Sequence, residues 1–135
     1  MTGTTSAEPT GAVTGGLRTM LRLEGLGLFL GMTLLYWCWE GSWWIFAALF
    51  LAPDLSFAGY LGGPRTGAAV YNAAHSYMLP MALMTTGFVT ASPLVLSIAI
   101  IWLAHIGFDR ALGYGLKYTE GFGFTHLGRI GKKSN

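Results

Sequence analysis

Two histidines and two aspartates in this chain have the side chains needed to hold a metal ion. His105 and Asp109 are four residues apart, so on a helix they lie on one face. Asn72 and Tyr71 precede His75 by three and four residues, so either could orient that histidine. Imidazole and carboxylate ligands suit Zn, Mn or Fe. The residue types therefore predict a divalent-metal site with these candidate ligands: Asp54, His75, His105, Asp109 and, from the tail, His126.

The same side chains also have ordinary structural roles, which the sequence leaves open. Asp109 could pair with Arg110 or with a cation on a neighbouring helix, and Asp54 could cap a helix end. The histidines could bond carbonyls that Pro53 and Pro80 free, since proline lacks an N–H group. No compact ligand motif such as HExxH or CxxC is present. A structural role, for example as an accessory subunit of a membrane complex, therefore stands beside the metal site.

If the site is enzymatic, a bound metal could lower the pKa of a water to about 7 for hydrolysis. A lipid-derived ester or phosphoester is then the natural substrate, because the site would open towards lipid headgroups. Arg65 and Arg110 could hold a phosphate, as guanidinium groups do bidentately. A third alternative is a haem or pigment, since His75 and His105 could serve as two axial ligands.

Composition indicates which elements must position these residues. Of 135 residues, 53% are hydrophobic and 10% are charged, against about 25% charged in ordinary soluble domains. Charged side chains are missing from residues 25–39, 41–53 and 66–108, and the last stretch is long enough for two membrane crossings. We therefore predict an all-α integral membrane protein with spans near 21–39, 43–60, 68–89 and 94–112. The short connections make it an antiparallel four-transmembrane-helix bundle.

The lysines and arginines predict the orientation of this bundle. They all flank the first span, occupy the second loop, or lie at or beyond the end of the fourth span: Arg18, Arg22, Arg65, Arg110, Lys117, Arg129, Lys132 and Lys133. The positive-inside rule then places both termini in the cytoplasm. Four tryptophans mark the opposite interface, where such rings are favoured: Trp37, Trp39, Trp43 and Trp44.

The candidate ligands also share a depth in the predicted bilayer. At 1.5 Å per residue, Asp54 lies about 9 Å inward from Tyr60, and His75 and His105 lie about 10–11 Å inward from their span ends. Ionisable groups are costly in a membrane and mark functional sites there. Their gathering in the cytoplasmic half therefore predicts one polar cluster.

The chain ends are predicted to lie outside the membrane. Residues 1–17 are small and polar and predict a disordered tail, and residues 113–135 form a glycine-rich, basic cytoplasmic tail. If the second tail folds back, it brings His126 and Arg129 towards the cluster. Cys38 has no second cysteine with which to form an internal disulfide. The formal net charge of +2, without a basic run interleaved with aromatics, argues against a nucleic-acid partner.

Several long strings carry a family resemblance: PDLSFAGYLGGPRTGA from Pro53, YNAAHSYMLP, WLAHIGFDRALGYGLKY and THLGRIG. They resemble the bacterial membrane-protein family known as domain of unknown function 4260, from about Leu21 to Gly131. The resemblance implies a multi-pass protein of the bacterial inner (cytoplasmic) membrane and no particular activity. The order of Asp, His and late Thr-His residues is more loosely similar to LexA-regulated membrane-bound metal-dependent hydrolases. The lipid bilayer is the expected partner, with a homo-oligomer or a larger membrane complex left open.

Overall fold

The computed structural model describes residues 11–119 and 123–130, so parts of both predicted tails (1–10, 120–122 and 131–135) lie outside the described residues. The described chain is mainly helical. Its helices are α1 (Gly15–Cys38), α2 (Trp43–Leu51), the 3₁₀ helix η1 (Ala52–Gly62), α3 (Pro64–His75), α4 (Met78–Val89) and α5 (Pro93–Leu112). Two short antiparallel strands follow, β1 (Phe124–Thr125) and β2 (Gly128–Arg129).

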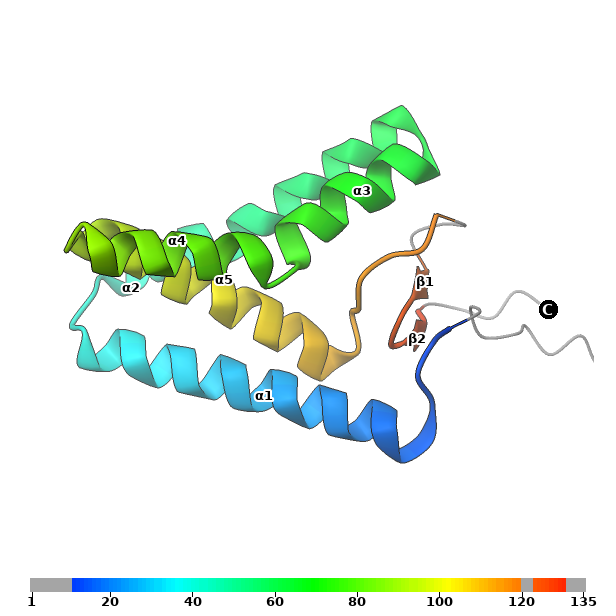
Figure 1. The fold of residues 1–135 in the computed structure, drawn as a ribbon, viewed down its shortest axis with the longest axis horizontal. Helices are drawn as coiled ribbons and strands as arrows, with labels where there is room; N and C mark the ends of the chain where they lie inside the picture. Colours follow the sequence, from blue (N-terminus) through cyan, green and yellow to red (C-terminus); the bar gives the residue numbers. More distant parts are fainter. Residues whose placement is uncertain (1–10, 120–122, 131–135) are drawn as a thin grey trace, which may run out of the picture.

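The helices run back and forth along the long axis of the molecule (Figure 1). The start of α1 and the turn between η1 and α3 lie at one end, and the α1–α2 and α4–α5 loops lie at the other. Three stretches are long and apolar enough to cross a membrane: α1, α2 together with η1 (Trp43–Gly62), and α5. The helical, apolar architecture is thus as predicted, whereas α3 and α4 have only 12 residues each.

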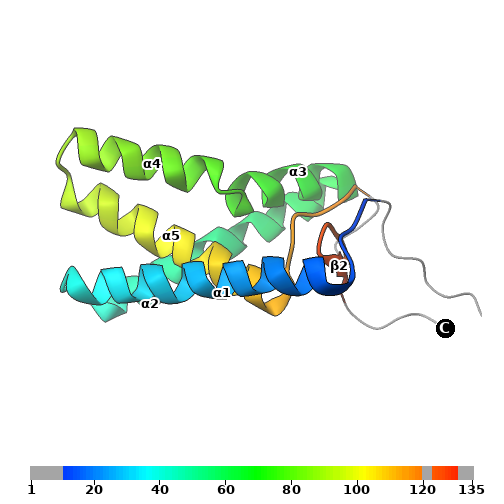
Figure 2. The same cartoon turned by 60° about the horizontal axis from the view of Figure 1, so that its bottom comes forward.

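Helix α5 lies at the centre of the molecule and packs against α1, α2 and α4, whereas η1 packs mainly against α3 (Figures 1 and 2). Two glycines let α1 approach α5 closely. A Cβ atom on Gly25 would lie 2.4 Å from the Cβ of Arg110, and one on Gly107 would lie 2.7 Å from the Gly25 carbonyl oxygen. The polar residues of α5 are therefore held at a fixed distance from the first helix.

The second predicted span changes its helix type at a proline. Helix α2 ends at Leu51, and the chain continues as a 3₁₀ helix of 11 residues that contains Pro53 near its start. The Leu49 carbonyl, which Pro53 cannot bond, accepts a hydrogen bond from the N–H of Ala52 instead. Such a long 3₁₀ run is uncommon, and it aligns side chains three residues apart.

The third predicted span is interrupted, where the sequence predicted one continuous span over 68–89. Helix α3 ends at His75, Ser76 is extended, and α4 begins at Met78. Pro80 lies in the first turn of α4, where its missing N–H group has no helical partner to lose. The carbonyl groups at the end of α3, which the break leaves without helical partners, accept hydrogen bonds from side chains of α5. Trp102, for example, donates to the Ala74 carbonyl at 2.6 Å.

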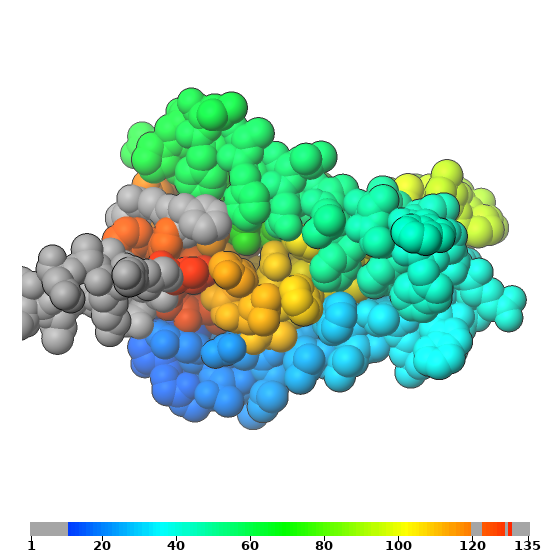
Figure 3. Space-filling view, turned by 180° about the vertical axis from the view of Figure 1, so that it is seen from behind, coloured from blue at the N-terminus to red at the C-terminus, as the bar shows by residue number. Residues whose placement is uncertain are grey.

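The segment after α5 folds back onto the helices. Gly113, in the left-handed conformation with φ 93°, ends α5. Lys117 then forms a β-bridge with Thr125, and the Val13 N–H before α1 donates to the His126 carbonyl at 2.9 Å. Figure 3 shows this segment between α1 and α3. The return of the tail, which the sequence left conditional, is therefore present in the described residues.

Candidate metal site

Three elements bring four predicted ligands together. Asp54 comes from the first turn of η1, His75 from the last residue of α3, and His105 with Asp109 from one face of α5. The two Nε2 atoms are 3.1 Å apart. His75 Nε2 lies 3.5 Å from Asp54 and 3.3 Å from Asp109, and His105 Nε2 lies 3.3 Å and 3.1 Å from the same carboxylates. All four donor atoms lie within 4.8 Å of one another.

These distances match a small metal ion with four ligands. Donor atoms about 2.0–2.1 Å from a tetrahedral zinc ion are about 3.3 Å apart. The histidine–histidine and histidine–carboxylate distances of 3.1–3.5 Å fall around that value. Two carboxylates also balance the charge of a divalent ion, which makes the centre neutral among apolar helices.

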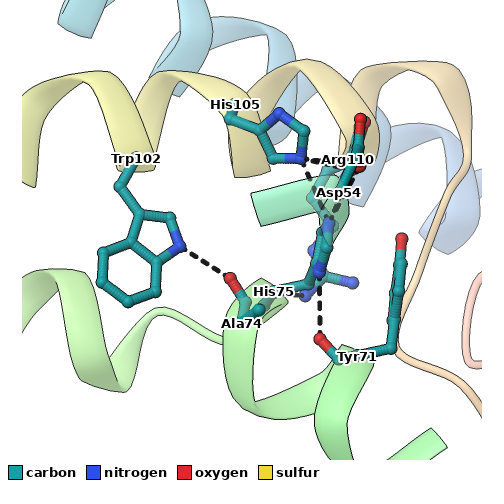
Figure 4. A network of polar contacts seen from close by, with 8 residues as sticks. Asp54, Tyr71, Ala74, His75, Trp102, His105 and Arg110 are labelled. Atoms are coloured by element: carbon teal, nitrogen blue, oxygen red, sulfur yellow. Dashed lines mark hydrogen bonds and ion pairs between the residues drawn. The ribbon is translucent and has the colours of Figure 1, made fainter. Parts of the chain in front are cut away.

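The hydrogen bond of His75 prepares one ring nitrogen to bind a metal. Its Nδ1 lies 2.9 Å from the Tyr71 carbonyl oxygen, which can only accept, so Nδ1 carries the proton and the neutral ring presents a lone pair at Nε2 (Figure 4). The Tyr71 ring stacks on the imidazole with a centroid distance of 3.8 Å. The predicted orienting role of Tyr71 thus has a physical basis, through its backbone and its ring.

His105 is held by packing more than by hydrogen bonds. The ring of Phe50 meets its imidazole edge-on at 5.2 Å. Its Nδ1 atom is buried beside the Phe50 backbone, without a hydrogen bond of ordinary geometry among the described residues. The two Nε2 atoms are closer together than the about 4 Å between two histidine nitrogens bound to one haem iron, so this geometry fits a small ion better than a haem.

Arg110 binds the backbone of one candidate ligand without being one of the four clustered donors. It is buried, and its Nη2 donates to the His75 carbonyl at 3.0 Å, which caps α3 at the ligand itself. Its Nη1 faces His126 Nδ1 at 3.4 Å, and that nitrogen also accepts from the Leu116 N–H at 2.9 Å. His126 therefore lies against Arg110 and is not one of the four clustered donors.

Other predicted residues lie further from the centre. Arg65 is exposed in the first turn of α3, ten residues before His75 and therefore about 15 Å along the helix. Asn72 binds the tail backbone: its amide donates to the Lys117 carbonyl at 2.8 Å, and its oxygen accepts from the Lys117 N–H at 2.6 Å. Arg129 lies in β2. The structural pairing of Asp109 with Arg110 is not seen among the described contacts, where Asp109 pairs with the histidines.

The carboxylates form the accessible side of the centre. The Asp54 side chain is 37% exposed and that of Asp109 is 15% exposed, against 3% for His75. A pocket of about 260 Å³ adjoins this side, lined by Asp54, Phe57, Tyr71, Asp109 and Tyr114. A molecule that enters this pocket would meet the two carboxylates first.

Lys117 brings a positive charge close to two rings of the same pocket, and no local pattern of the sequence indicated this. Its Nζ lies 4.8 Å from the centre of the Tyr71 ring and 5.7 Å from that of Tyr114. Burial lowers the pKa of Lys117 to about 8, opposed by the Asp109 carboxylate and assisted by Arg110. Lys117 is far from α3 in the sequence. Only the docked tail shows that its side chain lies beside Tyr71 of α3.

Comparison with known proteins supports the family resemblance. A family model described as Domain of unknown function (DUF4260) matches residues 18–130. No curated protein and no solved structure matches the chain. The looser likeness to metal-dependent hydrolases stays a prediction.

Proposed function

Because the chain belongs to the DUF4260 family, whose description assigns no activity, we propose its function from the site: a membrane-embedded, metal-dependent hydrolase of a lipid-derived ester or phosphoester. The observation that carries the proposal is the pair of Nε2 atoms 3.1 Å apart, each within 3.5 Å of both carboxylates. Two nitrogen atoms at that distance are held together either by a proton, as an N–H···N hydrogen bond, or by a cation between them. A divalent ion satisfies both nitrogens and both carboxylates at once.

The accessible side of the centre favours a catalytic ion over a structural one. Structural zinc sites are closed by four protein ligands, commonly with cysteine, whereas catalytic sites keep a position open. Here two imidazoles and two carboxylates would fill a tetrahedral zinc ion, whereas an ion that takes five or six ligands, such as Mn or Fe, would keep a position open on the side of the carboxylates, where a pocket of about 260 Å³ adjoins them. A bound ion would supply Lewis-acid chemistry and lower the pKa of a water to about 7.

The surroundings favour a membrane substrate with a negative charge. The ligands come from helices whose neighbouring segments are apolar enough to cross a membrane. The positive charge of Lys117, over two rings that line the pocket, would attract the anionic oxygen of a phosphoester. Hydrolysis breaks the ester C–O or P–O bond, and the hydroxyl and proton of one water pass to the two products.

Metal content tests the first step of this proposal. We expect about one divalent ion per chain by elemental analysis of the purified protein, and less than a tenth of that in Asp54→Asn, His105→Ala and Asp109→Asn. His126→Ala is the matched control, because His126 lies against Arg110 and should leave metal content unchanged. Equal metal content in all of these variants would contradict the metal site and support a structural, accessory-subunit role.

Activity tests the second step. We expect fluorogenic lipid esters or phosphoesters in detergent micelles to be cleaved by the metal-loaded protein, to be spared after chelation, and to be cleaved again when Zn²⁺ or Mn²⁺ is restored. A protein that holds its metal yet cleaves neither class would contradict the hydrolase and leave a metal-stabilised accessory protein.

A further inference from the structure

A second pocket lies next to the metal site and has a different character. It has a volume of about 320 Å³, and its lining is almost wholly apolar: Leu49, Ala52, Pro53, Ser56, Ala74, Ile98 and Trp102. This volume is at the small end of ligand sites, which span about 300–1,000 Å³. Ala52 is exposed at its rim, on the stretch Trp43–Gly62 that is apolar enough to cross a membrane. The pocket therefore opens where lipid would surround the protein.

The 3₁₀ helix η1 forms a wall between the two pockets. Side chains three residues apart are aligned in such a helix. Pro53 and Ser56 accordingly line the apolar pocket, whereas Asp54 and Phe57 line the pocket at the carboxylates. The unusual helix type thus gives one segment two functional faces, one of which carries a metal ligand.

The opposite wall is connected to the metal ligands as well. Ala74 directly precedes His75, and Trp102 lies one turn before His105 on α5. The Trp102 indole donates to the Ala74 carbonyl at 2.6 Å, which joins the two elements across the pocket. Figure 4 shows Trp102 and Tyr71 on opposite sides of His75. The histidine pair therefore lies between the apolar pocket and the carboxylate pocket.

One polar atom in the apolar pocket lacks a partner. The Oγ of Ser56 is buried and has no hydrogen bond among the described residues. A buried hydroxyl without a partner is unfavourable, and native proteins seldom leave one unless a ligand or water completes it. A rotation about its Cα–Cβ bond would present this hydroxyl to an oxygen atom of a molecule bound in the pocket.

We propose that the apolar pocket binds a single acyl chain of a membrane lipid, with the Ser56 hydroxyl donating to the oxygen of its ester or carboxyl group. The chain enters from the bilayer past Ala52, and its polar end lies at Ser56, on the other face of η1 from Asp54. This deepens the proposed function by specifying an acyl-chain substrate, and only the reaction at the polar end depends on that function. The occupancy of the pocket does not depend on the metal.

Photo-crosslinking tests the pocket in the full chain. The probe is a diazirine-bearing palmitic acid in nanodiscs of phosphatidylethanolamine and phosphatidylglycerol, with labelled peptides mapped by mass spectrometry. We expect labelling to concentrate on the peptide that contains Ile98 and Trp102. Ala52→Leu, which fills the pocket mouth, should lower that labelling at least fivefold. Ala48→Leu makes the same change one turn earlier, at an exposed residue outside the lining, and should leave it unchanged.

A second comparison isolates Ser56. Ser56→Ala should lower labelling by the fatty-acid probe about threefold to tenfold, as expected for the loss of one hydrogen bond, and should spare a diazirine alkane without the carboxyl group. Equal labelling of the Ala52→Leu and Ala48→Leu proteins would overturn the acyl pocket, and so would uniform labelling of all lipid-facing helices. Asp54→Asn should retain pocket labelling within twofold, so failure of the metal site is distinguishable from failure of this inference.

Discussion

The pairing of two imidazoles places a strict requirement on the residues around them. His75 keeps its Nε2 lone pair available only while Nδ1 donates to the Tyr71 carbonyl, so the end of α3 must hold its shape. Arg110 provides this constraint by binding the carbonyl of His75 itself. The guanidinium is thus a positioning group for the proposed metal centre, where the sequence suggested an anion-binding role.

This role of Arg110 predicts a defined loss of metal affinity. Arg110→Met keeps an unbranched apolar stem but removes the guanidinium and its hydrogen bonds, and we expect zinc affinity to fall about tenfold to a hundredfold, as for other residues that orient metal ligands. Competition with a chromogenic chelator measures the affinity. Arg65→Met is the matched control, because Arg65 is exposed near the start of α3. Equal affinities of the two variants would show that Arg110 does not position His75.

His126 predicts an effect of pH on the tail. Burial first, and then the neighbouring Arg110, lower the pKa of His126 to about 4, against a weaker opposing hydrogen bond from Leu116. Glu24 of α1 shares a cavity of about 350 Å³ with both side chains. Because the usual pKa of histidine is about 6.5, the undocked tail binds a proton first. Docking is therefore complete above about pH 6.5 and weakens as the pH falls towards 4.

Hydrogen exchange at the Leu116 amide, which donates to His126, measures this docking. After correction for the intrinsic rate, we expect its protection to fall by up to about thirtyfold between pH 7.5 and pH 5. His126→Asn preserves an acceptor that does not titrate and should remove the pH dependence. A wild-type protection factor that does not change over this range would rule out His126 as the titrating group.

At the scale of elements, the approach of α1 to α5 depends on glycine. Gly25→Ala would place a methyl group against the Cβ of Arg110, and we expect a loss of about 1–3 kcal/mol in the free energy of unfolding. Gly27→Ala is the control on the same helix, since nothing lies within 4 Å of its added Cβ and alanine favours a helix. Thermal unfolding in detergent measures both. Similar melting temperatures for both variants would contradict the close contact.

The elements also show which parts of the site a sequence can predict. His105 and Asp109 follow from helical periodicity, and Asp54 and His75 follow from their common depth, because these arguments need only local geometry. The break between α3 and α4 could not be predicted from local geometry. The carbonyls at the end of α3 are satisfied there by side chains of α5, which lie far along the chain.

The acyl pocket and the docked tail were missed for the same reason. Ser56 lines the apolar pocket because η1 is a 3₁₀ helix, and no local pattern of the sequence predicted this helix type. Lys117 reaches the carboxylate pocket only because the Asn72 side chain binds its backbone, across 45 residues of sequence. Both features depend on contacts between segments that are far apart in the chain, and a single sequence does not show which segments meet.

At the scale of the whole molecule, the asymmetry of charges and rings predicts the orientation. The start of α1, the η1–α3 turn and the strands β1 and β2 lie at one end of the molecule, and the α1–α2 and α4–α5 loops lie at the other (Figure 1). Lysine and arginine gather at the first end, and the tryptophans near Cys38 at the second. From the positive-inside rule we predict that the first end, together with the proposed metal site, faces the cytoplasm.

Cysteine labelling in intact cells measures this orientation. The exposed Cys38 should react with a membrane-impermeant maleimide, because it lies at the tryptophan-rich end. In a Cys38→Ser background, Thr90→Cys in the α4–α5 loop should react in the same way, whereas Thr66→Cys beside the η1–α3 turn should react only after the membrane is permeabilised. Labelling of Thr66→Cys in intact cells, with protection of Thr90→Cys, would reverse the topology and place the proposed site on the outer side. Labelling of both would show that the third crossing, broken between α3 and α4, does not span the membrane.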